Sequence, residues 1–263
     1  MTAAEHLKRR KQVDLSQPDA VVIGIGYALT DNVYSLIQRR IDFGPPFPPP
    51  QPLPSGADDF LAFINGDLRP FVREEVFPGV EFTREGIYGH SGGGLFVTYA
   101  LITDPGMFDT FVVGSPSVMV SNGTILGDLV TRLGDGMGIQ GEVYPSWNNS
   151  SSSSSGKVEG GGGGGGIIKK VQQFNETGPA VFIGTGELEQ FPLRMRTQTE
   201  AQFRDRKAFA QRIAQTAYSH ELYDRLVGSG RMRDVVYKEY VGQDHAGVGG
   251  SALMDGISYF LDW

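Results

Sequence analysis

Cysteine is missing from all 263 residues of the chain. Its absence excludes disulfide bonds, a thiol nucleophile and metal sites built on thiolates. A chain without disulfides needs no oxidising compartment, so we expect a cytoplasmic protein. The sequence also offers no cluster of ligands at the spacing of a metal site, and we predict neither a metal nor a cofactor.

Excess positive charge and long apolar runs are missing as well. The 30 acidic residues outnumber the 23 lysines and arginines, for a net charge of −7, whereas nucleic-acid-binding proteins normally carry a basic surface. No run approaches the roughly 18 apolar residues that cross a membrane. Residues 1–11 lack the apolar core of a signal peptide. We therefore expect no nucleic-acid partner and no membrane span.

The most informative segment that is present is Gly89-His90-Ser91-Gly92-Gly93. It stands between a strand-like stretch, residues 85–88, and a helix-like stretch, residues 94–101. Strand, Gly-x-Ser-x-Gly and helix make up the nucleophile elbow of α/β-hydrolases, in which the serine occupies a strained backbone conformation. We expect a Cβ at either outer glycine to clash, and the N–H of Gly92 to face an oxyanion. The alternative is a glycine-rich turn that contains a serine by chance.

Strand-like and helix-like segments alternate along the chain, which predicts a doubly wound, mostly parallel sheet with helices on both faces. The length favours a single α/β-hydrolase domain over residues 1–263. The expected buried strands are Ala20–Gly26, Phe108–Gly114, Ala180–Gly184 and Asp234–Val241, and the expected later helices are Ile167–Phe174, Gln198–Leu226 and Leu253–Leu261.

Two segments have compositions that oppose regular structure. Residues 44–54 are mostly proline, which predicts an extended surface loop. Residues 148–166 contain six consecutive serines and seven consecutive glycines. Such a segment buries too little apolar surface to offset its ordering entropy, so we predict a disordered insertion within the domain.

A serine nucleophile needs a base, and the base needs an orienting acid. In α/β-hydrolases the acid and then the histidine follow the serine along the chain. Of the four histidines, His245 alone follows the last predicted strand in a loop of small residues, so it is the predicted base, while His90 is expected to point away from the serine. Glu189 is the predicted acid. Glu187 is the second choice. Asp244 ranks third, because it is adjacent to His245 in sequence and adjacent side chains usually point apart.

A resemblance to a known family rests on several segments: Val22–Tyr27, Arg39–Phe43, Gly89–Gly93, Ser115–Ser117, Gly186–Glu189 and Gly242–His245. With these segments the chain resembles an esterase family of the α/β-hydrolases, and within it the siderophore esterases, which cleave ester linkages of iron-carrying trilactones. The resemblance extends over nearly the whole chain outside residues 148–166.

The resemblance implies a serine ester hydrolase that acts through an acyl-enzyme on siderophore-type esters. It implies that Ser91 is the nucleophile, that His245 is the base and that Arg39 and Tyr27 contact the substrate. Any iron would arrive as part of the substrate. Arg39 could instead form a salt bridge with Asp42. Some members of the family work with a serine–histidine dyad, so whether Glu189 is needed for catalysis stays open.

One departure from the family concerns the N-terminal edge of the sheet. The family's second oxyanion donor follows a strand that precedes Ala20–Gly26, the first strand expected here. We therefore expect a sheet that lacks its first strands and an oxyanion hole in which Gly92 alone is assigned. Losing one donor typically costs about 10²–10³ in turnover. Two alternatives to an active esterase follow: a protein that binds a siderophore or ester without hydrolysing it, and an acyltransferase on the same scaffold.

Overall fold

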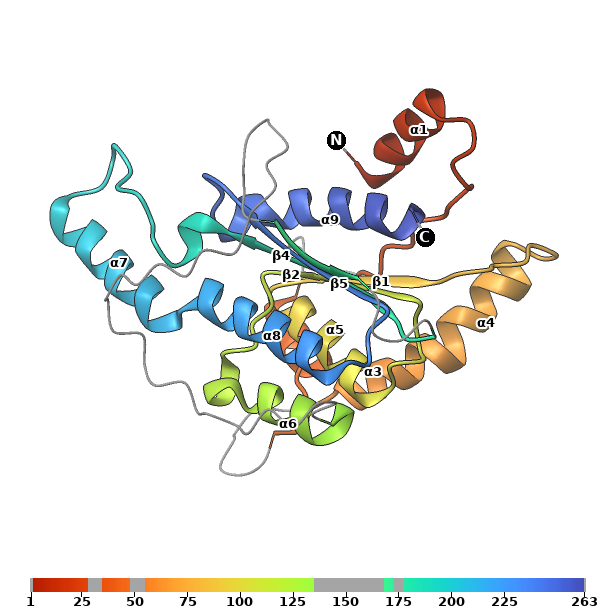
Figure 1. Cartoon of the computed structure of the whole chain (residues 1–263), viewed down its shortest axis with the longest axis horizontal. Helices are drawn as coiled ribbons and strands as arrows, with labels where there is room; N and C mark the ends of the chain where they lie inside the picture. The colour runs from red at the N-terminus through yellow and green to blue at the C-terminus, as the bar shows by residue number, and fades with distance from the viewer. Residues whose placement is uncertain (1, 28–34, 48–54, 135–167, 173–176, 263) are drawn as a thin grey trace.

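The computed structural model describes residues 2–27, 35–47, 55–134, 168–172 and 177–262 (Figure 1). The strands are β1 (Gly86–His90), β2 (Thr110–Gly114), β3 (Ile168–Gln172), β4 (Ala180–Gly186) and β5 (Asp234–Tyr240). The helices and helical turns are α1 (Ala3–Val13), α2 (Leu36–Asp42), α3 (Ala57–Phe63), η1 (Ile64–Leu68), α4 (Arg69–Phe71), η2 (Val72–Val76), α5 (Gly92–Thr103), η3 (Val120–Gly123), α6 (Thr124–Leu133), η4 (Glu187–Glu189), α7 (Glu200–Ile213), α8 (Gln215–Ser229) and α9 (His245–Leu261).

The described strands form one sheet in the order β1-β2-β4-β5-β3, and this confirms the predicted α/β class. β1, β2, β4 and β5 run parallel, while β3 pairs antiparallel with β5. The carboxyl ends of the parallel strands therefore meet at one edge, where open α/β sheets bind ligands. Ser91 follows β1, Ser115 follows β2, Glu189 follows β4, and His245 begins the helix after β5.

Helices cover both faces of the sheet (Figure 1). α9 packs across β2 and β4 on one face, and α1 lies outside α9. On the other face, α5 packs against β1 and β2, α8 packs against β4 and β5, and α6 contacts both of these helices. Among the described residues, none of the helices combines the length and apolar character needed to cross a bilayer.

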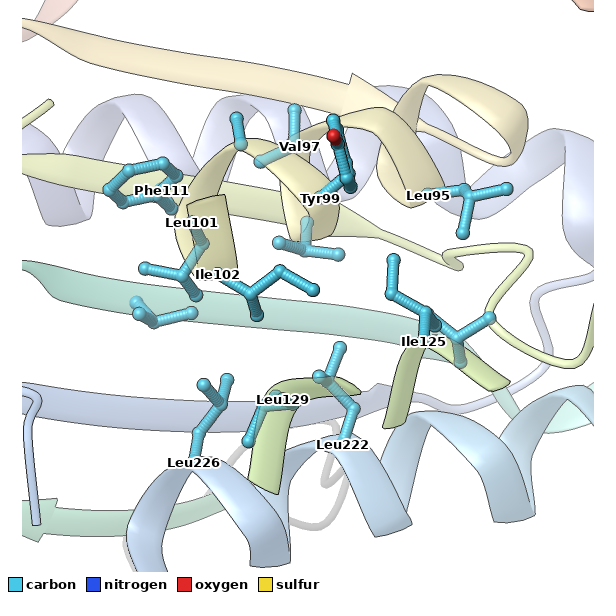
Figure 2. Close-up of a cluster of buried hydrophobic side chains, with 14 of the residues drawn as sticks. Leu95, Val97, Tyr99, Leu101, Ile102, Phe111, Ile125, Leu129, Leu222 and Leu226 are labelled. Atoms are coloured by element: carbon cyan, nitrogen blue, oxygen red, sulfur yellow. The ribbon is translucent and has the colours of Figure 1, made fainter. Parts of the chain in front are cut away.

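The main core lies between the sheet and the layer of α5, α6 and α8, as Figure 2 shows. α5 is buried over residues 93–102 because it is apolar nearly all round. α6 is amphipathic and buries one stripe of aliphatic side chains toward this core, namely Ile125, Leu126, Leu129 and Leu133. This packing fixes α5, and with it the position of the serine that precedes its first turn.

The expected buried strand at Ala20–Gly26 is wrong. Residues 20–27 are irregular, and the side chains of Val22 and Ile23 are each 48% exposed. An apolar, β-branched run becomes a strand only beside a partner strand, and in the described part of the sheet β1 pairs with β2 alone. Residues 3–13 form α1, so the described residues place no strand ahead of β1.

Two later expectations also need correction. The segment expected as a helix at Ile167–Phe174 contains β3, whose main chain pairs with β5. The long helix expected at Gln198–Leu226 is two helices, α7 and α8, which meet at Ala214 in a left-handed conformation with φ of 52°. Of the proline-rich loop, residues 44–47 are irregular and 48–54 lie outside the described residues, as does the whole of 148–166.

Candidate active site

Ser91 stands at the sharp turn between β1 and α5, with φ of 60° and ψ of −118°. These angles are strained for an L-residue and match the expected elbow. Gly89 permits the turn, because a Cβ at this position would lie 2.1 Å from the carbonyl oxygen of Gly93. The expected clash at Gly93 is wrong: a Cβ there would meet only the ring of Phe43, at 3.8 Å.

Backbone hydrogen bonds connect Ser91 to the last residue of β2 and to the loop that follows it. The N–H of Ser91 donates to the carbonyl of Gly114 at 2.9 Å, and the N–H of Ser117 donates to the carbonyl of Ser91 at 3.0 Å. The hydroxyl oxygens of Ser91 and Ser117 lie 3.5 Å apart. The strained turn is thus held from both sides, which presents the hydroxyl of Ser91 at the carboxyl edge of the sheet.

Hydrogen bonds join Ser91, His245 and Glu189 in sequence. Oγ of Ser91 lies 2.9 Å from Nε2 of His245, and Nδ1 of His245 lies 2.5 Å from Oε2 of Glu189. A carboxylate at Nδ1 keeps the proton on that nitrogen, which leaves Nε2 free to accept the proton of the serine. The side chain of His245 is 47% exposed, whereas that of Glu189 is 2% exposed.

The carboxylate of Glu189 has further donors besides His245. Its Oε1 accepts from the hydroxyl of Ser115 at 2.5 Å, from the N–H of Gly186 at 2.6 Å and from the hydroxyl of Thr185 at 3.3 Å. Burial raises the pKa of Glu189, but the hydrogen bonds from His245, Ser115 and Gly186 outweigh burial and leave this pKa below its ordinary value. Glu189 is therefore an ionised carboxylate at neutral pH.

The other two candidate acids lie elsewhere. Oε2 of Glu187 accepts from the N–H of Gly242 at 2.8 Å, which fixes the turn after β5. Asp244 caps the N-terminus of α9, where its side chain accepts from the N–H of Gly247 at 3.0 Å. Both carboxylates stabilise the loop that carries His245, and neither occupies the position of Glu189.

Gly92 is the first residue of α5, so its N–H has no acceptor within the helix. A helix N-terminus of this kind attracts an anion, as the oxyanion assignment requires. The ring of Phe43, at the end of α2, lies next to this corner: it would be 3.9 Å from a Cβ at Gly92. An aromatic ring thus borders the position where an ester carbonyl would bind.

Arg39 lies near the same corner, and Tyr27 lies near Arg39 and Asp42. The guanidinium carbon of Arg39 is 4.8 Å from the ring centroid of Phe43. The positive charge of Arg39 also lowers the pKa of His90, the residue before the serine. Burial, and then a hydrogen bond to Asp42, raises the pKa of Tyr27 to about 12. Tyr27 is therefore a neutral phenol whose described polar partner is Asp42.

Ser115 and His90 contact the acid and the base, and sequence reasoning gave neither of them a role. Ser115 belongs to a segment that carried the resemblance, but nothing in its pattern identified it as the donor to Glu189. His90 packs its ring against that of His245, with centroids 4.7 Å apart. Among the described residues, no group of three or more histidines and carboxylates could hold a metal ion.

Known proteins resemble the chain along nearly its whole length, although no family model matches it. It is 34% identical to a siderophore enterobactin esterase of Emericella nidulans over 270 aligned positions, covering 98% of this chain and 77% of the relative. The chain belongs to the siderophore esterase family. Another relative is a siderophore triacetylfusarinine C esterase of Aspergillus fumigatus, at 27% identity, with 100% of this chain and 78% of the relative covered.

A solved structure of the family has the same fold. The siderophore hydrolase EstA from Aspergillus nidulans superimposes with a TM-score of 0.77 at 33% identity, covering 99% of this chain and 77% of the hydrolase. The expected α/β-hydrolase fold is therefore confirmed, and with it the membership of this chain in a family of ester hydrolases.

Proposed function

We propose that this siderophore esterase homologue is a serine hydrolase whose nucleophile is Ser91, with His245 as base and Glu189 as the orienting acid. The observation that supports this assignment best is the pair of hydrogen bonds at 2.9 and 2.5 Å that joins the three side chains across the carboxyl edge of the sheet. The backbone strain at Ser91 supports it independently, because strained residues cluster at active sites.

In the first half of the reaction, Oγ of Ser91 attacks the ester carbonyl while Nε2 of His245 takes the hydroxyl proton. The carbonyl oxygen becomes an oxyanion, which the N–H of Gly92 stabilises. The tetrahedral intermediate collapses when the carbonyl–alkoxy bond breaks and His245 donates its proton to the leaving alcohol. Ser91 is then left as an acyl ester.

Water completes the reaction. His245 removes a proton from a water molecule, whose oxygen attacks the acyl carbon. The bond from this carbon to Oγ then breaks, His245 returns the proton to Ser91, and the acid product leaves. Glu189 remains ionised throughout and stabilises the imidazolium form of His245.

The proposed substrate is an ester linkage of a siderophore. Such molecules carry many oxygen atoms that can accept hydrogen bonds, which suits the guanidinium of Arg39 beside the ring of Phe43. The two named relatives, a siderophore enterobactin esterase and a siderophore triacetylfusarinine C esterase, support this substrate class. We propose a cytoplasmic location on the ground that the chain has no cysteine.

A fluorophosphonate probe tests the assignment directly, because it reacts only with an activated serine. We expect labelling of the wild-type chain and its loss in both Ser91→Ala and His245→Ala. Matched controls are Ser121→Ala, another serine at positive φ, and His220→Ala, a ring packed in α8. A folded wild-type chain that stays unlabelled would overturn the proposal and favour the binding-only alternative.

The substrate is tested separately with a trilactone siderophore, iron-free and ferric, and an acetate ester of p-nitrophenol. Ser91-dependent cleavage of the trilactone is expected. Labelling and aryl-ester cleavage without trilactone cleavage would refute the substrate while leaving the serine hydrolase intact. Transfer of the acyl group to an added alcohol, in preference to water, would identify an acyltransferase.

A further inference from the structure

His90 connects the strand that carries the nucleophile to the helix that carries the base. It is the last residue of β1 and directly precedes Ser91. Its ring lies against the ring of His245, with centroids 4.7 Å apart and planes tilted by 40°. Both histidines thus belong to one local unit, although they are far apart in the sequence.

The first turns of α9 close around the ring of His90. A Cβ at Gly249 would lie 3.3 Å from Cδ2 and Cγ of this ring, so a side chain at this position would press directly on the ring of His90. On the same face of β1, the hydroxyl of Tyr88 donates to the carbonyl of Gly249 at 2.6 Å. Two alternate side chains of one strand therefore hold the segment in which His245 lies.

The hydrogen bonds of His245 leave its ring free to tilt, and contact with His90 restricts this tilt. The two bonds hold only Nδ1 and Nε2, so they do little to restrain a tilt of the ring about the line through these two nitrogens. With 47% of its side chain exposed, His245 has little protein around it to stop this motion. The ring of His90, which lies against that of His245 at a tilt of 40°, opposes this motion.

The electrostatic setting keeps His90 neutral. Burial lowers its pKa, and the charges of His245 and Arg39 lower it further, against the opposing effects of Glu189 and of a hydrogen bond to the backbone of His245. Its Nε2 is buried, and among the described residues it has no hydrogen-bond partner. His90 therefore contacts His245 as an uncharged ring, which packs against the imidazole and also makes a hydrogen bond to the backbone of His245.

We propose that His90 is a positioning residue, whose neutral ring holds the imidazole of His245 in the tilt at which Nε2 faces Ser91 and Nδ1 faces Glu189. The inference rests on the proposed function, in which His245 is the base. It assigns His90 no contact with the substrate or the reacting atoms. A misplaced base loses rate steeply, by about 10²-fold for an ångström.

The test compares His90→Ala, which removes the ring, with His90→Phe, which keeps a flat ring in its place. We expect His90→Ala to lower kcat about 10–100-fold with little change in KM, and His90→Phe to recover most of the loss. His220→Ala serves as the matched control, because its ring packs on Tyr237 in the core rather than on the site. Equal kcat in wild type and His90→Ala would overturn the proposal.

A second variant acts on the same contact from the helix side. Gly249→Ala pushes a methyl group against the ring of His90, so it should lower kcat in the wild-type background and have a smaller effect in His90→Ala. Strictly additive effects of the two changes would contradict a shared contact. This double-mutant cycle needs only folded proteins, which thermal unfolding verifies for each variant.

A readout independent of turnover separates the two proposals. The proton between Nδ1 of His245 and Glu189 should give a strongly deshielded proton NMR signal, sharp in wild type and broadened or absent in His90→Ala. If wild type fails to react with the fluorophosphonate probe, the proposed function fails whatever the NMR signal shows. If wild type reacts and the signal is unchanged in His90→Ala, the positioning role alone fails.

Discussion

The hydroxyl of Ser115 donates a 2.5 Å hydrogen bond to Oε1 of Glu189, which leaves Oε2 of the same carboxylate to accept from His245. The two oxygens of Glu189 thus have different partners: Oε1 accepts from Ser115, and Oε2 accepts from the base His245. Ser115 is itself held at φ of 37°, an unusual conformation for a residue other than glycine. The residue that follows β2 therefore contributes to the site as a fully buried serine that holds the acid.

Removing the hydroxyl of Ser115 should lower the stability of the fold and raise the pKa of Glu189. For Ser115→Ala we expect the free energy of unfolding to fall by about 1.5–3 kcal/mol, the range for hydrogen bonds to charged groups. The pKa of Glu189 should rise, which moves the acid limb of kcat/KM to higher pH. Urea unfolding and a pH profile measure the two effects.

Ser121→Ala is the control for this change. Ser121 also has positive φ, and its buried hydroxyl has no hydrogen-bond partner among the described residues. Its removal should leave the stability nearly unchanged and the pH profile unaltered. Equal losses in both variants would show that the strained backbone, rather than the bond to Glu189, accounts for the effect.

The identity of the acid can be decided by two amide substitutions. Glu189→Gln keeps the shape but presents a neutral group to Nδ1 of His245, so kcat should fall by up to about 10⁴-fold, as when a triad carboxylate becomes an amide. Glu187→Gln changes only the acceptor of the Gly242 N–H and should cost no more than a few-fold. Full activity in Glu189→Gln would instead establish a serine–histidine dyad.

The order of the chemical groups along the chain made it predictable that Ser91, Glu189 and His245 lie close together, because each follows a particular strand of the sheet. The preference for Glu189 over Glu187 also agrees with the geometry, since Glu189 alone of the two lies 2.5 Å from Nδ1 of His245. Ser115 and His90 were not predictable, because their contacts depend on how neighbouring strands and α9 pack in three dimensions.

The fold errors have a related cause. The apolar pattern of Ala20–Gly26 describes what a strand needs from its side chains, but strand formation also requires a neighbouring strand. Likewise, residues 198–226 have helical composition throughout, and no local pattern marked Ala214 as the residue that adopts φ of 52° and divides α7 from α8. Local sequence determines the propensity of a segment for helix or strand, while tertiary contacts determine which strands pair and where a helix is interrupted.

The depressed pKa of Glu189 makes a definite prediction for stability against pH. Since the folded-state pKa is below the ordinary value of 4.5, the ionised carboxylate stabilises the fold above about pH 4.5. This contribution is lost as the pH falls through the lower, folded-state pKa. Urea unfolding from pH 7 to pH 3 should show a steeper decline below pH 4.5 for wild type than for Glu189→Gln, and parallel curves would contradict it.

Two glycines of the elbow should respond oppositely to alanine. Gly89→Ala places a Cβ 2.1 Å from the oxygen of Gly93 and 2.8 Å from Val97, so the turn must move, at a cost of about 3 kcal/mol or more. Gly93→Ala meets nothing nearer than 3.8 Å and should be neutral or stabilise α5 by up to about 1 kcal/mol. Thermal unfolding distinguishes the two variants. Equal destabilisation would show that Gly93 has as little room for a side chain as Gly89.

Arg39 and its neighbour Arg40 offer a matched test of substrate binding. Arg39 lies 4.8 Å from the ring centroid of Phe43 beside the oxyanion corner, whereas Arg40 is exposed. On the proposal that the guanidinium of Arg39 donates to oxygen atoms of the substrate, its replacement should weaken binding, since charged hydrogen bonds are worth about 1.5–3 kcal/mol. For Arg39→Gln we therefore expect KM for a ferric trilactone to rise about 10–100-fold, with kcat and the neutral acetate ester little affected.

Arg40→Gln removes the same charge one residue away and should leave both substrates unaffected. The comparison between substrates matters as much as that between variants, because a damaged site would slow the neutral ester too. Steady-state kinetics on the two esters measures both. If Arg39→Gln impairs them equally, Arg39 supports the fold around Phe43 and does not bind the oxygen atoms of the siderophore.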